Sequence, residues 1–145
     1  MTKTGYIRLE DRGLLEIAGA DTRQFLQGLI SNDVGKVAPD TVIYAAFLTP
    51  QGKYLHDFFV LELGGALLLD CEKERLDDLK RRLGMYRLRA KVTLADRTAD
   101  YAVAALIGDG AAERVGLPSE RAGAAVPLGS GLACVDPRLP AIGVR

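Results

Sequence analysis

The side chains most often used in catalysis are few and widely spaced in this chain of 145 residues. His56 is the only histidine, and the two cysteines, Cys71 and Cys134, stand 63 positions apart. A structural zinc site needs about four Cys or His ligands at close spacing, so this set predicts no metal centre. Two isolated cysteines without a C-x-x-C pair are more typical of reduced core or surface thiols than of a disulfide.

Common catalytic motifs are also missing from the sequence. It contains no G-x-S-x-G nucleophile elbow, no P-loop and no G-x-G-x-x-G dinucleotide motif. The 19 basic and 19 acidic residues leave a formal net charge of zero, so we expect neither nucleic acid nor a membrane as a partner. A local basic patch is compatible with this balance. No apolar leader follows Met1 and the longest apolar stretches are short, which together favour a cytoplasmic protein.

Hydrophobic periodicity predicts strands in groups that are separated by single helices. The predicted strands cover residues 6–10, 14–18, 42–49, 54–63, 66–71, 88–94, 101–107 and 132–135. Short turns such as residues 50–53 join several of them, and this spacing favours antiparallel pairing. The order ββαβββαββ of the elements up to residue 107, followed by the last short strand, therefore predicts one α+β domain over residues 1–145. Its sheet should be mainly antiparallel with helices packed on it, unlike a Rossmann fold.

Two helices are predicted between these strands. The first runs over residues 22–30, with Asp21 as its N-cap and Gln24 in the position that completes a capping box. Gly28 lies inside this helix at a cost of about 1 kcal/mol, which close packing against another backbone would explain. The second helix covers residues 72–83, where acids come early and bases late, as the helix dipole prefers.

Three segments of the sequence occur together in register: residues 25–34 (FLQGLISNDV), residues 44–53 (YAAFLTPQGK) with the following His56-Asp57, and residues 86–92 (YRLRAKV). In this order and spacing they resemble the amino-terminal half of the YgfZ-type proteins, a branch of the glycine-cleavage T-protein superfamily. The resemblance implies a T-protein-like folate-binding fold with tetrahydrofolate as ligand. It also implies a role in iron–sulfur cluster assembly or repair, with iron–sulfur enzymes or assembly proteins as partners.

The resemblance implies site residues as well. In the aminomethyltransferases of the superfamily, a Tyr and an Asp beside the hairpin contact the pterin of tetrahydrofolate, and the matching positions are Tyr44 and Asp57. Asp70 matches a position where the transferases carry a folate-contacting Asn. Arg87 and Arg89 would attract the glutamate tail of folate. No catalytic residue and no metal ligand is implied.

The residue types at Tyr44 and Asp57 suit a pterin. Counted outward from the turn at residues 50–53, the two positions come close to opposite each other on consecutive strands. A carboxylate can accept two hydrogen bonds from neighbouring N–H donors, and an aromatic ring can stack on a flat heterocycle. On the residues alone, a solvated strand position is the favoured interpretation of Asp57, and a core aromatic that of Tyr44. Arg87 and Arg89 equally fit a solvated strand face.

Two other functions stay open at this point. An aminomethyltransferase carries two adjacent carboxylates where this chain has His56-Asp57, and strand alternation points His56 to the opposite side from Asp57. An interaction module that binds no folate would instead leave Tyr44 and Asp57 apart, or buried without a cavity.

The chain is expected to be only the amino-terminal part of such a protein. The Lys-Gly-Cys-Tyr-x-Gly-Gln-Glu segment of YgfZ-type proteins does not occur, and neither Cys71 nor Cys134 has a comparable setting. The folate cavity of the family is built from both halves of its core, of which one is here. Because an unfinished sheet exposes an apolar edge, we expect this stretch of chain to self-associate.

Overall fold

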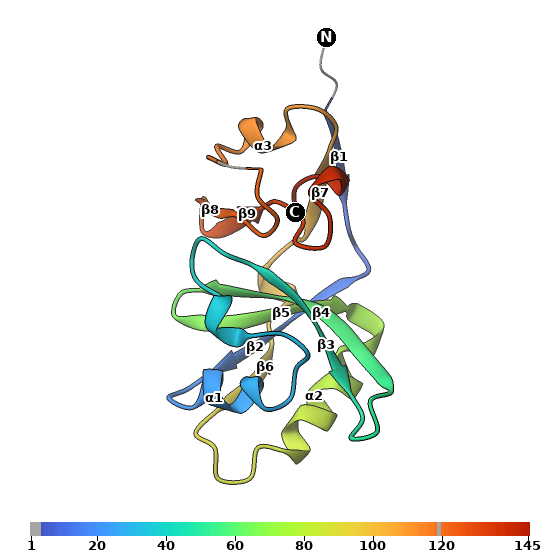
Figure 1. Cartoon of the computed structure of the whole chain (residues 1–145), viewed down its shortest axis with the longest axis vertical. Coiled ribbons are helices and arrows are strands. Elements are labelled where there is room, and N and C mark those ends of the chain that lie inside the picture. Colours follow the sequence, from blue (N-terminus) through green and yellow to red (C-terminus); the bar gives the residue numbers. More distant parts are fainter. Residues whose placement is uncertain (1–3, 119) are drawn as a thin grey trace.

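The computed structural model describes residues 4–118 and 120–145. Its centre is a five-stranded sheet in the order β3–β4–β5–β2–β6, in which every neighbouring pair is antiparallel. The strands are β2 (Arg12–Ala18), β3 (Ile43–Leu48), β4 (Tyr54–Leu63), β5 (Ala66–Glu72) and β6 (Thr93–Asp96). The mainly antiparallel α+β fold predicted from the sequence is therefore confirmed (Figure 1).

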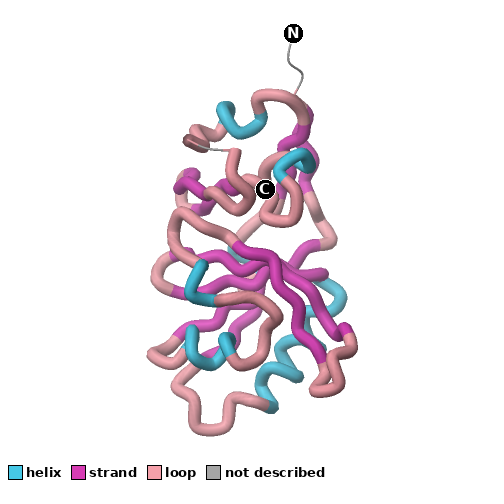
Figure 2. The backbone as a smooth tube through the Cα atoms, viewed as in Figure 1, coloured by secondary structure: helices cyan, strands magenta, loops and turns pink. Residues whose placement is uncertain are grey.

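One face of the sheet carries the helices and the main hydrophobic core. Figure 2 shows these short helices beside the strands; they are α1 (Thr22–Gln27), α2 (Leu76–Met85) and 3-10 turns at Val34–Lys36 and Lys73–Arg75. Side chains alternate across a strand, so every second residue of the sheet points into this core. The buried sheet residues on this face are Leu15, Ile17, Ile43, Ala45, Phe47, Phe58, Val60, Leu67, Leu69 and Cys71.

The opposite face of the sheet is covered by the carboxyl-terminal part of the chain (Figure 1). This layer contains β7 (Ala104–Ile107), α3 (Ala111–Arg114), β8 (Ala125–Leu128) and β9 (Gly131–Cys134), with 3-10 turns at Thr98–Asp100 and Pro140–Ile142. Val42 and Phe59 of the sheet side pack against Ala125 and Cys134 of the covering layer. Any site on this face of the sheet therefore lies between two layers.

The short connection between β1 (Gly5–Arg8) and β2 favoured a hairpin of these two strands. The structure contradicts this, because β1 does not pair with β2. It pairs antiparallel with β7 instead, with Tyr6 opposite Leu106. The physical reason is that β5 and β6 occupy both edges of β2, so no edge of that strand is free.

The strand predicted at residues 88–94 begins only at Thr93. Residues 87–90 form a turn, closed by a hydrogen bond of 2.7 Å from the Ala90 N–H to the Arg87 carbonyl. The Lys91 N–H then donates to the Asp21 carboxylate at 2.8 Å. The Asp21 carboxylate is therefore bonded to this loop and makes no hydrogen bond to the first turn of α1. The predicted side-chain N-cap bond of Asp21 is wrong.

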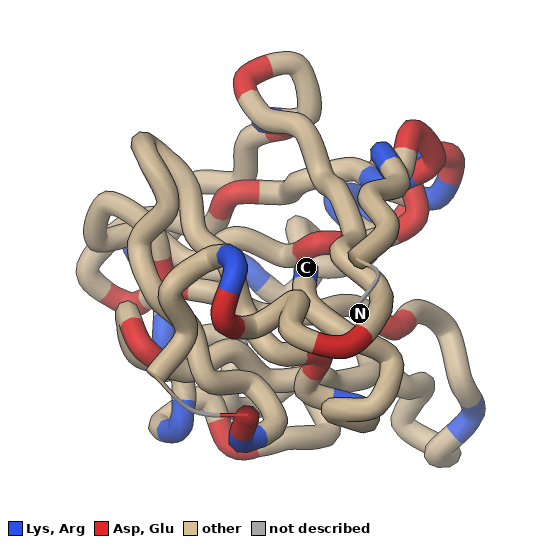
Figure 3. Tube along the Cα trace, turned by 90° about the horizontal axis from the view of Figure 1, so that it is seen from above, with Lys and Arg blue, Asp and Glu red and all other residues tan. Residues whose placement is uncertain are grey.

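Basic and acidic residues are interspersed along the chain (Figure 3), in keeping with its zero net charge. No helix in the described part of the chain is both long and apolar enough to cross a bilayer. The charge of any one surface therefore has to be judged from its own residues.

Candidate functional site

Tyr44 and Asp57 lie in contact on the face of the sheet that the carboxyl-terminal layer covers. In the β3–β4 ladder Tyr44 is opposite Phe59 and Asp57 is opposite Ala46, so the pair is diagonal on one face. The Tyr44 hydroxyl donates a hydrogen bond to Asp57 Oδ2. The Tyr54 hydroxyl donates to Asp57 Oδ1 at 3.0 Å. One carboxylate thus receives two phenolic donors.

Sequence reasoning missed Tyr54 for a structural reason. Tyr54 and Asp57 are three positions apart, which places them on opposite faces of a regular strand. The register of β3 against β4 shifts at Phe47 and Leu48, so that Leu48 lies opposite Tyr54. A bulge of this kind changes the alternation and brings Tyr54 to the side of Asp57.

The electrostatics of the site keep Asp57 ionised. Burial raises the pKa of its carboxyl, but the hydrogen bonds from Tyr44 and Tyr54 and the charge of Arg12 outweigh this effect and hold the pKa below its usual value. Burial and the bond to Asp57 raise the pKa of Tyr44 to about 12. At neutral pH the site is therefore an anion with two neutral phenol donors.

Three guanidinium groups surround the neighbouring Phe59 ring. The Cζ atoms of Arg145, Arg138 and Arg12 lie 4.1, 4.9 and 5.8 Å from its centroid. Cations are attracted to the electron-rich face of an aromatic ring. Because Phe59 also contacts Tyr44, with 5.4 Å between ring centroids, one aromatic and cationic patch extends across this face.

Asp70 is held by two of these arginines. Only 5 % of the residue is exposed. Arg12 Nε donates to its Oδ1 at 2.8 Å, and Arg145 Nη2 donates to its Oδ2 at 2.9 Å. Asp70 lies opposite Phe59 in the β4–β5 ladder, so it shares the face of Tyr44 and Asp57.

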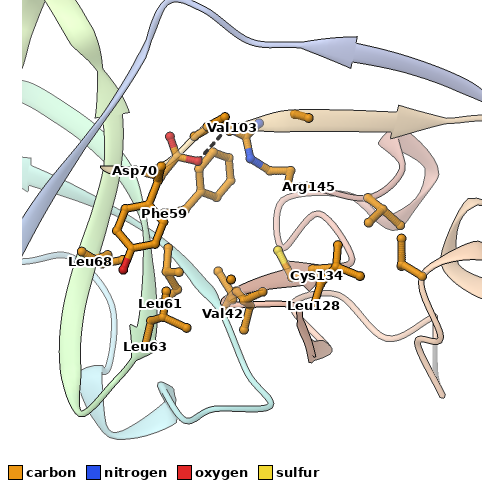
Figure 4. A pocket seen from close by; sticks show the side chains of 18 of the residues that line it. Val42, Phe59, Leu61, Leu63, Leu68, Asp70, Val103, Leu128, Cys134 and Arg145 are labelled. Carbon is orange, nitrogen blue, oxygen red and sulfur yellow. Dashed lines mark hydrogen bonds and ion pairs between the residues drawn. The ribbon is translucent and has the colours of Figure 1, made fainter. Parts of the chain in front are cut away.

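A cavity of about 320 Å³ opens beside Asp70, between the sheet and the carboxyl-terminal layer (Figure 4). Its walls are largely apolar and include Val42, Phe59, Leu61, Leu63, Leu68, Val103, Leu128 and Cys134. Asp70 and Arg145 add polar groups, and the buried Arg145 Nε has no hydrogen-bond partner in the described chain. A mostly apolar cavity with a few polar groups is typical of small-molecule sites. Phe59 separates this cavity from the Tyr44–Asp57 pair, neither of which lines it.

Arg138 is positioned by an acid that the sequence patterns did not reveal. Asp136 is fully buried and binds Arg138 through both carboxylate oxygens, with its Oδ1 3.0 Å from Nε and its Oδ2 2.7 Å from Nη2. The Arg138 guanidinium therefore points toward Tyr44, with 5.9 Å between Cζ and the ring centroid. In the sequence, the only indication that Asp136 and Arg138 could form an ion pair was their spacing of two positions in the tripeptide Asp-Pro-Arg.

Arg87 and Arg89 lie apart from this patch. They are in the loop after α2, not on a common strand face, and they line a hollow with Phe25. Phe25 belongs to the core on the helix side of the sheet, whereas Tyr44 packs on the other side. The structure thus brings Tyr44, Asp57 and Asp70 to one face and leaves the two arginines on the other.

Comparison with known proteins places this fold. The profile of the GCVT N-terminal domain matches residues 2–117. The chain belongs to this family. Among solved structures, the glycine cleavage system aminomethyltransferase T from Bartonella henselae superposes on 92 % of the chain with a TM-score of 0.70 and 14 % sequence identity, which shows a shared fold. This GCVT-domain chain covers 38 % of that protein.

Curated relatives of the GCVT-domain chain are iron–sulfur cluster assembly factors. The mitochondrial IBA57 homologue of Aspergillus fumigatus is 32 % identical over 99 % of this chain, and that of Aspergillus clavatus is 34 % identical over 99 %. The mitochondrial IBA57 of Mus musculus is 34 % identical over 60 % of the chain. The chain covers only 37 %, 36 % and 28 % of these relatives, respectively.

The cytoplasmic location predicted from the sequence is contradicted by these relatives, which are named as mitochondrial proteins. That prediction depended on the absence of an apolar leader after Met1. The GCVT-domain chain spans well under half of each relative, so this absence carried no information about location.

His56 lies across β4 from Asp57, as strand alternation predicted. It is almost fully buried, and its Nε2 is 2.8 Å from Asp78 Oδ2 of α2, so the pair joins the sheet to the helix. Burial lowers the pKa of His56 below its usual value of 6.5. Hydrogen bonds from His56, Arg82 and Arg81 hold the pKa of Asp78 well below its usual range.

We expect acidification to destabilise the GCVT domain through His56. Because its native pKa lies below the unfolded value of 6.5, the unfolded state binds the proton first, and the free energy of unfolding falls as the pH drops below that value. His56→Gln keeps an N–H donor for Asp78 but cannot titrate. Urea unfolding near pH 7.5 and near pH 5.5 should therefore show a smaller loss in the variant. Equal losses in both proteins would contradict this role of His56.

Both cysteines of the GCVT domain should be inert toward thiol reagents in the native state. Cys71 and Cys134 are buried, and burial raises the pKa of each thiol to about 12. The thiolate is the reactive form, so neither side chain can supply it at neutral pH. Titration with a chromogenic disulfide should detect two thiols in urea and almost none in buffer. Rapid reaction of Cys134 in buffer would show that the covering layer opens readily, and rapid reaction of Cys71 would show that the helix side of the sheet does.

Proposed function

We propose that this chain contributes the pterin-contacting part of a tetrahydrofolate-binding protein of the YgfZ type. The complete protein would assist the assembly or repair of iron–sulfur clusters. In this proposal residues 1–145 are the amino-terminal part of the folate-binding domain. Tyr44 and Asp57 contact the pterin, and Asp70 borders it. Support for the assembly role comes from curated relatives that are named as iron–sulfur cluster assembly factors.

The observation that carries the folate proposal is the contact between Tyr44 and Asp57. A pterin edge presents neighbouring N–H donors, which need an ionised carboxylate as acceptor, and the pKa of Asp57 lies on the ionised side. Tyr54 is an exposed side chain, so its hydroxyl can move away from Asp57 Oδ1 and free that oxygen for a ligand. The apolar cavity lies on the other side of Phe59 and borders Asp70, so it offers volume for another part of the ligand and not for the ring that contacts Asp57.

Other parts of the proposal have less support from the geometry. Arg87 and Arg89 lie across the sheet from Tyr44, so their contact with a glutamate tail stays a prediction. Self-association of this stretch of chain also stays a prediction. The iron–sulfur enzymes or assembly proteins that the complete protein would serve belong to the proposal in the same way. An aminomethyltransferase is a weaker candidate, because position 56 holds a histidine where the transferases carry a second carboxylate next to Asp57.

A second candidate is an interaction module without folate, and one observation favours it. Both oxygens of Asp57 already accept hydrogen bonds, and Arg138 and Arg145 cover the Phe59 ring, so the face is satisfied without a ligand. In that case the site would serve to attach the carboxyl-terminal layer to the sheet.

Calorimetric titration of tetrahydrofolate into the complete protein, and in parallel into residues 1–145, tests the proposal. Binding to both would place the main contacts in this chain. Binding to the complete protein alone would mean that the remaining chain completes the pocket. No binding to either protein would overturn the folate proposal and leave the interaction module.

A further inference from the structure

The loop after α2 presents an apolar side chain that nothing in the chain covers. Leu88 is 90 % exposed, more than any other large hydrophobic residue in the described part of the chain. Its φ of +43° is the only positive value at a described residue other than glycine. Leucine avoids this left-handed region because its Cβ crowds the backbone.

The turn itself would favour a glycine at this position. The Ala90 N–H closes the turn on the Arg87 carbonyl at 2.7 Å, which makes Leu88 its first central residue. A positive φ at a central position of a tight turn is a conformation that glycine usually supplies. Leu88 belongs to none of the hydrophobic clusters of the chain, so no internal packing offsets the strain.

The surroundings of Leu88 combine apolar and basic side chains. Met85, the last residue of α2, and Tyr86, which follows it, are 57 % and 43 % exposed. The exposed side chains of Arg87, Arg89 and Lys91 make no ion pair or hydrogen bond with another described residue. Tyrosine and arginine are the residue types that most often carry binding energy in protein interfaces.

A hollow of about 440 Å³ lies between this loop and α1. Phe25, Gly28 and Leu29 line its helix side, and Leu88 borders it. The close backbone packing predicted for Gly28 is not made, because a Cβ at this position would meet nothing within 4 Å. Gly28 instead follows the last residue of α1 with a φ of −78°, which any residue can adopt.

We propose that this surface, formed by residues 85–91 and the hollow beside α1, binds an acidic segment of a partner protein that places an apolar side chain in the hollow. The unpaired cations supply the charge complementarity. A second copy of this chain fits poorly, because it would bring two sets of these cations together. Asp21 is the one acidic residue of the described chain that lines the hollow, so each copy would offer a single carboxylate to the cations of the other. A shaped hollow beside the exposed leucine also suits a protein better than a fluid membrane. The surface lies across the sheet from Tyr44, so partner and ligand can bind together.

Selection of short random peptides displayed on phage against this chain, after depletion on the double variant Leu88→Gly/Arg89→Glu, tests the proposal. Acidic peptides that share an aromatic or aliphatic residue should be enriched. Fluorescence polarisation of one such synthetic peptide should show binding at least about tenfold weaker in Leu88→Gly, because a buried leucine contact is lost. Gly28→Leu, which fills the hollow, should weaken binding in the same way.

The controls separate docking from folding. Glycine suits the turn, so Leu88→Gly should not lower the melting temperature, and a loss of binding in this variant cannot be attributed to unfolding. Leu139→Ser alters an exposed leucine of the covering layer and should leave peptide binding unchanged.

Several outcomes would overturn the proposal. These are a selection without enrichment, enriched peptides that are not acidic, and equal affinities for the wild type and Leu88→Gly. Vesicles of phosphatidylcholine with about 30 % phosphatidylserine that bind the chain but not Leu88→Gly would identify a membrane as the partner. A dimer in sedimentation that Leu88→Gly dissociates would identify a second copy.

Discussion

Asp57→Asn should weaken tetrahydrofolate binding by about 10- to 100-fold, the effect of losing hydrogen bonds to a charged acceptor. The amide keeps the shape of the side chain and can still accept from Tyr44. It loses the charge, and its NH2 group meets the N–H donors of the pterin edge. Calorimetric titration of the variant, in whichever form of the protein binds tetrahydrofolate, measures the change.

A matched control is Asp109→Asn, which removes the same charge from an exposed position in the covering part of the chain. The affinity of Asp109→Asn for tetrahydrofolate should equal that of the wild type. The melting temperatures of Asp57→Asn and Asp109→Asn should both stay close to that of the wild type. If Asp57→Asn binds as tightly as Asp109→Asn, the pterin does not contact Asp57.

Asp70→Asn should lower the free energy of unfolding by about 3 kcal/mol, as expected when one partner of a buried ion pair is removed. The substitution leaves Arg12 and Arg145 without their shared carboxylate and places an amide N–H beside a guanidinium. Both arginine side chains retain some exposure, which keeps the expected value at the lower end of the range for buried pairs. Urea unfolding followed by circular dichroism measures it.

The comparison variant is Asp100→Asn, which breaks an exposed pair with Arg97 and should leave the free energy of unfolding nearly unchanged. Equal effects of the two substitutions would mean that the Asp70 pairs are solvated in solution. The same experiment separates two roles of Asp70. A stable variant with weak folate binding would place Asp70 in the ligand site, whereas a destabilised variant would identify it as a structural anchor.

The contact between Tyr44 and Asp57 was predictable because it depends on local chain geometry. A short turn at residues 50–53 joins β3 and β4, and a short turn sets the register of the two strands. Once the register is set, alternation decides which residues share a face, and it placed His56 on the side opposite to Asp57 correctly. The contact between Tyr54 and Asp57 was not predicted, because a register shift beside the turn changes that alternation.

The sequence by itself determined most of the strands, the two longer helices, the antiparallel β3–β4 and β4–β5 hairpins, and the family segments that single out Tyr44 and Asp57. Only the tertiary structure decided that β1 pairs with β7, that Arg138 and Arg145 cover Phe59, and that Leu88 stands in a left-handed turn. Periods of 2 and 3.6 residues report which side of an element is buried. They carry no information about which distant element covers that side, and Arg145 reaches Asp70 across 75 positions of sequence. Contacts of that range depend on how the layers pack, which the local pattern of either partner does not contain.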